Sequence, residues 1–185
     1  MSLFTVREWW GTTPGSASDE EFGGGCLVVG NLDNAADGSL KIATGSFSGL
    51  LRLYQPRQAG YQVEDLMVEE QLDAPILQLG AGQLLSDSNR VALAVLHPRS
   101  VAVYLVTAMA GTNASGGGGG GGRGMVSSDT KGASFFQITK AYEHAFERPA
   151  CNFVHGAFGG SYGHEQILIQ SMDGVIYVVV LGNRS

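Results

Sequence analysis

Short apolar runs separated by turns recur along this chain. The run Lys41–Gly45 is followed by a four-residue turn and by a second run, Leu50–Tyr54. The same pair of runs returns within Val91–Val106 and within Ile167–Val180. Two apolar runs joined by a tight turn are typical of a β-hairpin. The pattern therefore predicts three copies of one hairpin.

Further short segments flank each hairpin. Gly25–Gly30, Pro75–Gly80 and Cys151–Gly156 precede the hairpins, and Gln62–Leu72 and Phe135–Phe146 follow the first two. The first of these, with glycine at each end, predicts a buried strand. The periodicity of Gln62–Leu72 fits a helix or a strand. Its position after a hairpin favours a strand, and its acidic residues suit an exposed sheet edge.

The hairpins recur at a nearly constant spacing. Ile42 and Val91 are 49 residues apart, and Val91 and Ile167 are 76 apart. Leaving out the 22 residues from Gly111 to Gly132 reduces the second spacing to 54. A unit of about 50 residues with four strand positions is typical of a β-propeller blade.

The hairpin strands are apolar at successive positions, as in Val175–Val180. A strand with one face in solvent alternates between apolar and polar residues, whereas a strand covered on both faces is apolar at successive positions. We therefore expect an all-β fold, an incomplete β-propeller of about three four-stranded blades. Blade 1 spans about 25–72, blade 2 about 74–146, and a partial blade 3 about 151–180. In the hairpin turns, Gly49 and Gly174 are expected to adopt positive φ.

Three blades cannot close a ring of about four to eight blades. The sequence alone therefore predicts an exposed blade face at each end of the array, which favours assembly or aggregation. We expect the chain to be the N-terminal part of a longer propeller.

A low-complexity segment, Gly111–Gly132, interrupts the second unit and contains seven consecutive glycines. It has too few apolar side chains to offset its ordering entropy, so a disordered loop over 111–132 is expected. Arg123-Gly124 ends the tract without the Gly-Lys-Ser/Thr of a phosphate loop, and a single Arg-Gly unit does not indicate RNA binding.

Composition narrows the class of protein. The chain has 185 residues, 44% of them hydrophobic, and a formal net charge of −6, which argues against nucleic-acid binding. Cys26 and Cys151 are far apart and predict free thiols in a reducing compartment. The first ten residues lack the pattern of a signal peptide, and no apolar run approaches the roughly 18 to 20 residues of a membrane-spanning helix. We expect a soluble, intracellular protein.

One turn resembles the start of a calcium loop. Asp33-Asn34-Ala35-Ala36-Asp37-Gly38 places oxygens at alternate positions. However, Ala35 stands at a ligand position, and Thr44 stands where such a loop ends in Glu. A turn between strands is favoured, and a calcium-binding β-propeller remains the weaker alternative.

No set of residues predicts catalysis, a cofactor or a metal. His97, His144, His155 and His164 lack the spacing of metal ligands, although His155 and Cys151 share one strand face. No Gly-x-Ser-x-Gly elbow is present, and Asn113 matches a glycosylation acceptor only by chance. We therefore expect a non-enzymatic protein with no catalytic, cofactor-binding or metal-binding residues.

Trp9 and Trp10 allow two interpretations. Adjacent tryptophans near a terminus can anchor a partner protein, or they can dock the terminal segment on its own blade. The sequence leaves both open.

Several stretches, collinear and spread over nearly the whole chain, are shared with one known family. They are Ser2–Trp10, Gly25–Leu27, Asn31–Asn34, Gly45–Arg52, Glu64–Leu66, Leu93–His97, Tyr142–His144, Ala150–Asn152, Phe158–Gly160 and Ile169–Gly174. On these stretches the chain resembles the parathyroid-hormone-responsive B1 family, the ninth of the Bardet–Biedl syndrome proteins.

The resemblance implies an N-terminal propeller in a scaffold subunit of the BBSome, a coat-like complex that carries membrane proteins into and out of cilia. Its partners would be the other Bardet–Biedl subunits and, indirectly, membrane-protein cargo. The implied location is the cytoplasm, cilium, basal body and, peripherally, the ciliary membrane. Two departures are the longer glycine insertion and the loss of likeness after Tyr177. A stand-alone β-repeat adaptor that self-associates is the alternative.

Overall fold

The computed structural model describes residues 5–13, 20–86, 88–109, 135–158 and 165–180. Over these ranges the regular structure comprises eleven β-strands and one 3₁₀ helix, η1 (Val63–Asp65). No helix in the described part has the length and apolarity needed to cross a membrane. The predicted all-β class is confirmed. The loop predicted over 111–132, with Asn113 and Arg123, lies outside the described residues, as does His164.

The strands form three antiparallel sheets in which sequence neighbours are also neighbours in space. The first sheet contains β1 (Leu27–Gly30), β2 (Lys41–Gly45), β3 (Leu50–Tyr54) and β4 (Leu66–Gln71). The second contains β5 (Gln78–Gly82), β6 (Ala92–His97), β7 (Ser100–Met109) and β8 (Phe135–Ala145). The third contains β9 (Ala150–Gly156), β10 (Gln166–Ser171) and β11 (Ile176–Val179). The three predicted hairpins are β2–β3, β6–β7 and β10–β11.

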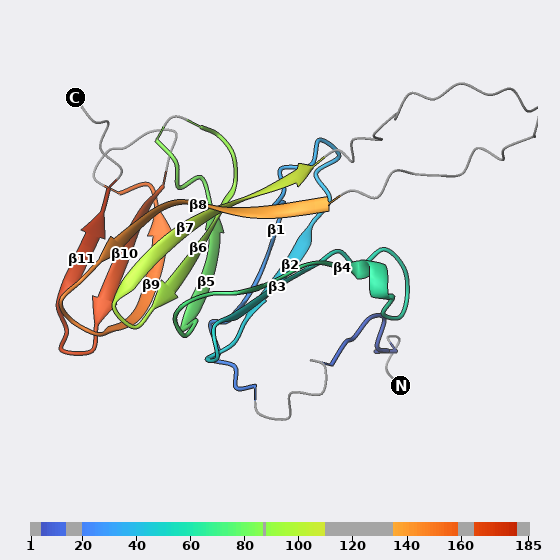
Figure 1. Cartoon of the computed structure of the whole chain (residues 1–185), viewed down its shortest axis with the longest axis horizontal. Helices are drawn as coiled ribbons and strands as arrows, with labels where there is room; N and C mark the ends of the chain where they lie inside the picture. Colours follow the sequence, from blue (N-terminus) through green and yellow to red (C-terminus); the bar gives the residue numbers. More distant parts are fainter. Residues whose placement is uncertain (1–4, 14–19, 87, 110–134, 159–164, 181–185) are drawn as a thin grey trace, which may run out of the picture.

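The sheets are stacked in sequence order, with the second between the other two (Figure 1). Leu51 and Leu53 of β3 belong to the core shared by the first and second sheets. Phe153 of β9 and Ile169 of β10 belong to the core shared by the second and third. The second sheet is therefore covered on both faces.

Strand β6 shows why the hairpins lack polar alternation. All six of its residues are buried. Leu93 and Val95 belong to the core with the first sheet, and Ala94 and Leu96 belong to the core with the third. Because the side chains on both faces of the strand are buried, both alternating sets are apolar.

The expectation that hairpin and flanking strands are buried on both faces is wrong for the outward-facing positions of the first and third sheets. Leu27 and Val29 of β1 are 62% and 54% exposed, so this strand is not buried as the sequence predicted. Ile176 and Val178 of β11 are 61% and 52% exposed. Only a central sheet has neighbours on both sides, and the strand sequence does not reveal which sheet is central.

Two strands begin at least three residues later than predicted. The segment predicted as one strand over 62–72 begins with η1, because the Asp65 carboxylate accepts the N–H of Gln62 (3.0 Å) and closes a tight turn. The strand predicted over 75–80 begins later, at Gln78. The Ile76 N–H is donated to the Ser46 carbonyl of the first hairpin (3.1 Å), so this residue joins the two sheets.

The two predicted turn glycines do adopt positive φ, at 88° for Gly49 and 87° for Gly174. Their surroundings differ. A Cβ on Gly49 would lie 2.7 Å from the Leu72 carbonyl oxygen and 2.9 Å from that of Ala74, whereas a Cβ on Gly174 would meet nothing within 4 Å. Gly49 therefore allows a close approach of backbone segments as well as the turn.

Candidate functional site

The N-terminal segment lies against the outer side of the first sheet. The Trp10 ring meets Tyr54 of β3 at 5.8 Å between centroids, and Glu20 is paired with Arg52 of the same strand (2.7 Å). The Phe47 N–H is donated to the Glu21 carbonyl (2.8 Å). The exposed face expected at this end is therefore partly covered by the chain itself. We call residues 5–13, together with the loop 55–65, the N-terminal platform.

Trp10 fixes the platform. Its Nε1–H is donated to the Asp65 carboxylate (2.9 Å), and its ring makes edge contacts with Tyr54 and with Tyr61 (6.0 Å, 63°). The neighbouring Trp9 is instead 52% exposed, and its carbonyl accepts the N–H of Gly60 (2.8 Å). Each of the two interpretations therefore fits one tryptophan. Trp10 docks on its own sheet, whereas Trp9 faces solvent, as a residue that anchors a partner protein would.

Asp65 is a buried carboxylate, 1% exposed. Burial acts to raise its pKa, but the hydrogen bonds from Trp10 Nε1–H and the Gln62 N–H stabilise the charged form and leave the pKa below its ordinary value. The platform is therefore held by an ionised group.

Arg52 ties the segment to the sheet by charge. Its Nη1 lies 2.7 Å from Glu20, and its Nε lies 2.6 Å from Glu69 of β4. The side chains of Arg52 and Glu20 are only 8% and 5% exposed. The hydrogen bond to Glu20, followed by that to Glu69, raises the pKa of Arg52 above its ordinary value.

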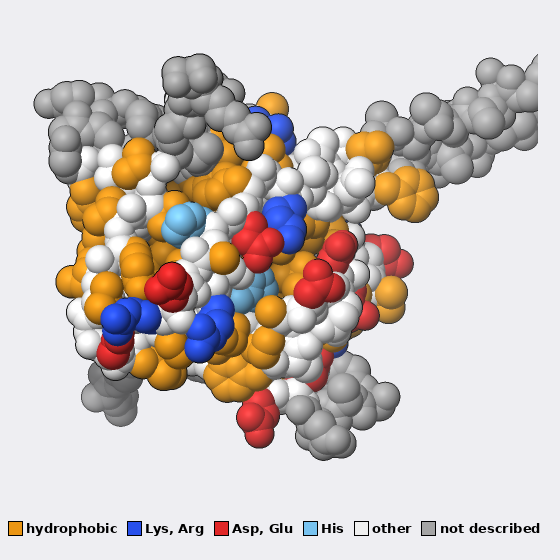
Figure 2. Space-filling model, turned by 60° about the vertical axis from the view of Figure 1, so that its left-hand side comes forward, with side chains coloured by type: hydrophobic (Ala, Val, Ile, Leu, Met, Phe, Trp, Pro, Cys, Tyr) orange, Lys and Arg blue, Asp and Glu red, His pale blue; other side chains and the backbone are white. Residues whose placement is uncertain are grey.

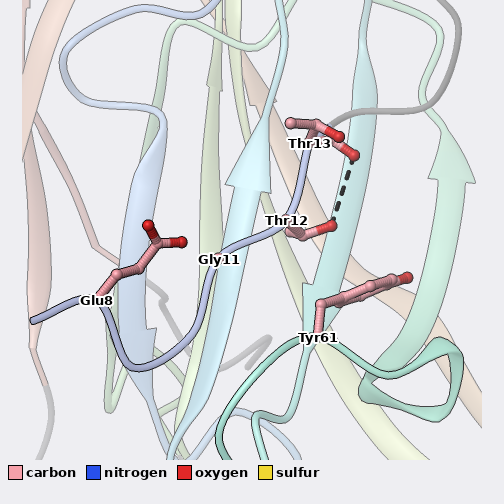
Figure 3. Close-up of a pocket in the computed structure, with 5 residues that line it drawn as sticks. All are labelled: Glu8, Gly11, Thr12, Thr13 and Tyr61. Atoms are coloured by element: carbon pink, nitrogen blue, oxygen red, sulfur yellow. Dashed lines mark hydrogen bonds between the residues drawn. The ribbon is translucent and has the colours of Figure 1, made fainter.

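A hollow of about 370 Å³ opens between the two parts of the platform (Figure 3). Glu8, Gly11, Thr12 and Thr13 line it from the N-terminal segment, and Tyr61 lines it from the loop. Its lining consists of a carboxylate, hydroxyl and carbonyl oxygens, and one aromatic ring. Such a set can accept hydrogen bonds but supplies no nucleophile paired with a base.

The loop considered for calcium has an internal cation. The Lys41 ammonium lies 2.6 Å from the Asp33 carboxylate and donates to the Ser39 carbonyl and hydroxyl at 3.0 and 2.7 Å. Lys41 is 1% exposed. Asn34 in the same loop bonds to the backbone of Val91, accepting its N–H at 2.7 Å. The loop therefore joins the first two sheets. The Lys41 ammonium also binds the oxygens that a calcium ion would need as ligands.

The described histidines lie in separate environments. His97 is buried, and its Nδ1 donates to the Pro75 carbonyl (2.8 Å). His144 packs its ring against Phe146 at 6.1 Å, and His155 is paired with Glu165. No group of three or more His, Cys, Asp or Glu side chains in the described ranges is arranged to hold a metal ion.

The two cysteines are free and differently placed. The Cys26 thiol is buried and donates to the Ile76 carbonyl (3.2 Å), and burial raises its pKa. Cys151 is exposed on β9. Neither thiol has a metal-binding or catalytic partner among the groups described above.

The third sheet presents an apolar outer face. Val154 is 55% exposed, and a groove of about 270 Å³ runs over this face. The groove is lined by Asn152, Val154, Leu168, Gln170 and Ile176. Figure 2 shows hydrophobic side chains gathered over the left-hand part of the molecule, where this sheet lies.

Sequence reasoning missed the contacts that hold the N-terminal part of the chain to the first sheet and to its loop. Glu20 and Arg52 are separated by 32 positions, and Trp10 and Asp65 by 55. Neither pair lies within one element, so no periodicity links them. The Trp-Trp pair was the one available sign that the N-terminal segment docks.

These observations define a class: an all-β protein built from repeated antiparallel meander sheets that are stacked face to face, with an N-terminal segment docked on the first sheet. The model of the family described as PTHB1 N-terminal matches residues 1–182, and the chain belongs to this family.

Similar proteins support this assignment. Over 182 residues the chain is 40% identical to Protein PTHB1 of Homo sapiens, covering 96% of this chain and 18% of the human protein. It is 40% identical to Protein PTHB1 of Xenopus laevis over 180 residues, covering 95% and 19%. The mouse protein of the same name is 39% identical over 182 residues. The chain thus spans about a fifth of the length of these relatives.

Proposed function

We propose that this chain forms part of a β-propeller in a non-enzymatic scaffold subunit of the BBSome, acting in the transport of membrane proteins to and from cilia. The observation that carries the proposal is the family match over residues 1–182. The partners are the other Bardet–Biedl syndrome subunits, with membrane-protein cargo bound indirectly. The protein works in the cytoplasm, basal body and cilium, and reaches the ciliary membrane through the complex.

The stacked sheets suit this role. Blades of a propeller pack face to face in sequence order around a ring, and the three sheets here follow such an order with two shared cores. The outward apolar face of the third sheet suits contact with a further sheet. Rigid stacked sheets present loops and edges at fixed positions, which is what a scaffold subunit requires.

Co-purification from ciliated cells tests the proposal. The tagged chain is expected to recover at least one other Bardet–Biedl subunit. The control is Gly45→Val, because a Cβ there would lie 2.5 Å from Ile76 and prevent the first two sheets from packing. If the folded chain recovers no such subunit while a tagged known subunit does, the scaffold assignment is wrong.

A second candidate function is a self-associating β-repeat adaptor, favoured by the exposed apolar face of the third sheet. Val178 lies on this face and is 52% exposed. In sedimentation, an adaptor of this kind forms a defined oligomer that Val178→Lys dissociates. Val6→Lys is the matched control, because Val6 is 97% exposed on the N-terminal segment. A monomer at every concentration tested excludes this function.

A further inference from the structure

The hollow on the N-terminal platform is lined by polar oxygen-bearing residues and one aromatic ring, with no basic residue among the five. Glu8 contributes a carboxylate, Thr12 and Thr13 contribute hydroxyl and carbonyl oxygens, and Tyr61 contributes its ring and hydroxyl. None of the five lining residues is a lysine, arginine or histidine. The lining therefore offers acceptors and a π-face, and lacks a positive charge that would repel a cation.

The oxygens of this lining have few partners of their own. The one hydrogen bond drawn between lining residues joins the Thr12 hydroxyl to the Thr13 carbonyl at a long 3.5 Å (Figure 3). The guanidinium of Arg57, in the same loop as Tyr61, is directed elsewhere, donating to the Glu64 carbonyl (2.6 Å) and to Gln55. The hollow thus keeps acceptors available to a donor from outside.

The walls are held in place before any ligand arrives. Tyr61 is packed edge-on against Trp10, which in turn donates to the buried Asp65 carboxylate. The N-terminal wall is joined to the loop by the hydrogen bond from the Gly60 N–H to the Trp9 carbonyl (2.8 Å). A pocket with fixed walls loses little conformational entropy on binding.

We propose that this hollow binds a basic side chain, preferably arginine, of a partner protein. A guanidinium carries five N–H donors in one plane and also stacks on aromatic rings, so it suits dispersed oxygens beside a tyrosine better than a compact ammonium does. The hollow is open rather than enclosed, which suits a side chain projecting from another protein. This site is independent of BBSome membership, because it concerns a contact that a short peptide can make.

The exposed Trp9 strengthens the case for a protein partner. It follows Glu8 in the N-terminal segment and is 52% exposed, on a backbone fixed at its own carbonyl and by the docked Trp10. Tryptophan, tyrosine and arginine are the residues most enriched at the energetic centres of protein interfaces. Tyr61 of this chain would meet an arginine of the partner in the hollow, and Trp9 adds an exposed aromatic residue to the same N-terminal segment.

The test compares two blocked tripeptides, acetyl-Gly-Arg-Gly-amide and its citrulline analogue, added to the whole chain. Citrulline has nearly the same shape as arginine but no charge. Binding is followed by amide resonances of Gly11, Thr12 and Gly60 and by tryptophan fluorescence. We expect the arginine peptide to saturate with a Kd on the order of 1 mM. The citrulline peptide should bind at least about fivefold more weakly, because its attraction to Glu8 is lost.

Variants locate the effect. Glu8→Gln is expected to weaken arginine binding several-fold and to abolish its preference over citrulline, whereas Glu64→Gln leaves both unchanged. Glu64 is the matched control because it is an exposed acid of the same platform that does not line the hollow. Equal binding of the two peptides to the unaltered chain, which needs no variant, overturns the proposal. Equal losses in the two variants also overturn it, because they indicate a diffuse charge effect.

Discussion

The side-chain amide of Gln78 pairs with the backbone of Phe153 like a strand residue. Its Nε2 donates to the Phe153 carbonyl (2.7 Å), and its Oε1 accepts the Phe153 N–H (2.9 Å). Gln78 begins β5, and Phe153 lies on β9, the edge strand of the third sheet that follows β8 in the chain. One side chain thus satisfies both polar groups of an otherwise unpaired edge position and sets the third sheet against the second.

Replacing Gln78 with alanine is expected to destabilise the protein. Both backbone groups of Phe153 lose their partner, and each buried group left unpaired costs about 1–3 kcal/mol. Urea unfolding followed by tryptophan fluorescence or circular dichroism measures the loss. Gln137→Ala on the exposed part of β8 is the control and is expected to change the free energy of unfolding little. Equal effects of the two substitutions contradict the role given to Gln78.

Lys41→Met tests the buried ion pair. Lys41 and Asp33 have side chains only 1% and 7% exposed, so removing the ammonium leaves an uncompensated buried carboxylate. We expect a loss of about 3–5 kcal/mol in the free energy of unfolding. Lys140→Met breaks a pair that is 45% and 39% exposed, with an expected loss below about 1 kcal/mol. The Lys41→Met/Asp33→Leu double variant should recover part of the lost stability, because it also removes the buried carboxylate. Calcium should not stabilise the unaltered chain, because the Lys41 ammonium already binds the Asp33 and Ser39 oxygens.

Alanine at the two turn glycines separates backbone strain from steric contact. Gly174→Ala meets no atom within 4 Å and should cost only the positive φ, about 1–2 kcal/mol. Gly49→Ala brings a Cβ within 2.7 Å of the Leu72 carbonyl oxygen, which should add about 1–3 kcal/mol. Thermal or urea unfolding of the pair gives the difference. If Gly174→Ala lowers the free energy of unfolding more than Gly49→Ala does, the close approach at Gly49 does not contribute to stability.

Acid should release the N-terminal platform through Asp65. Its pKa in the folded state lies below the ordinary value, so its contribution is present above the unfolded pKa and is lost as pH falls through the folded pKa. A protonated carboxyl group accepts a weaker bond from Trp10. The difference in unfolding free energy between the unaltered chain and Asp65→Asn should therefore be largest near neutral pH and shrink below about pH 4.

The measurement is urea unfolding at several pH values, with tryptophan fluorescence reporting the environment of Trp10. Glu64→Gln is the control, because that exposed acid neighbours Asp65 without bonding to Trp10. A pH dependence that is the same in Asp65→Asn and in the unaltered chain rules out this carboxylate as the titrating group.

The hairpins, their turn glycines and the repeat spacing could be predicted because each is a local property. A run of apolar residues around Gly49 or Gly174 specifies a hairpin wherever it lies in the fold. Strand limits were less accurate where a residue bonds outside its own sheet. Ile76, whose N–H is donated to the Ser46 carbonyl, delays the start of β5 in this way.

The platform could not be predicted in the same manner. Trp10 and Asp65 meet across 55 positions, and Arg52 reaches Glu20 across 32. The hollow beside Tyr61 is formed because Trp9 and Trp10 hold the N-terminal segment against the loop. Neither charge pattern nor periodicity marks Glu8 or Thr12 as lining residues.

By itself, the sequence determined that this chain forms three β-meanders, since strand and turn formation depend on neighbouring residues and on alternation along the chain. The tertiary structure alone decided which faces are buried. Stacking covers both sides of the second sheet, the docked Trp10 and Glu20 cover part of the first, and the third remains open. Burial depends on what lies opposite a side chain, and that partner is distant in sequence.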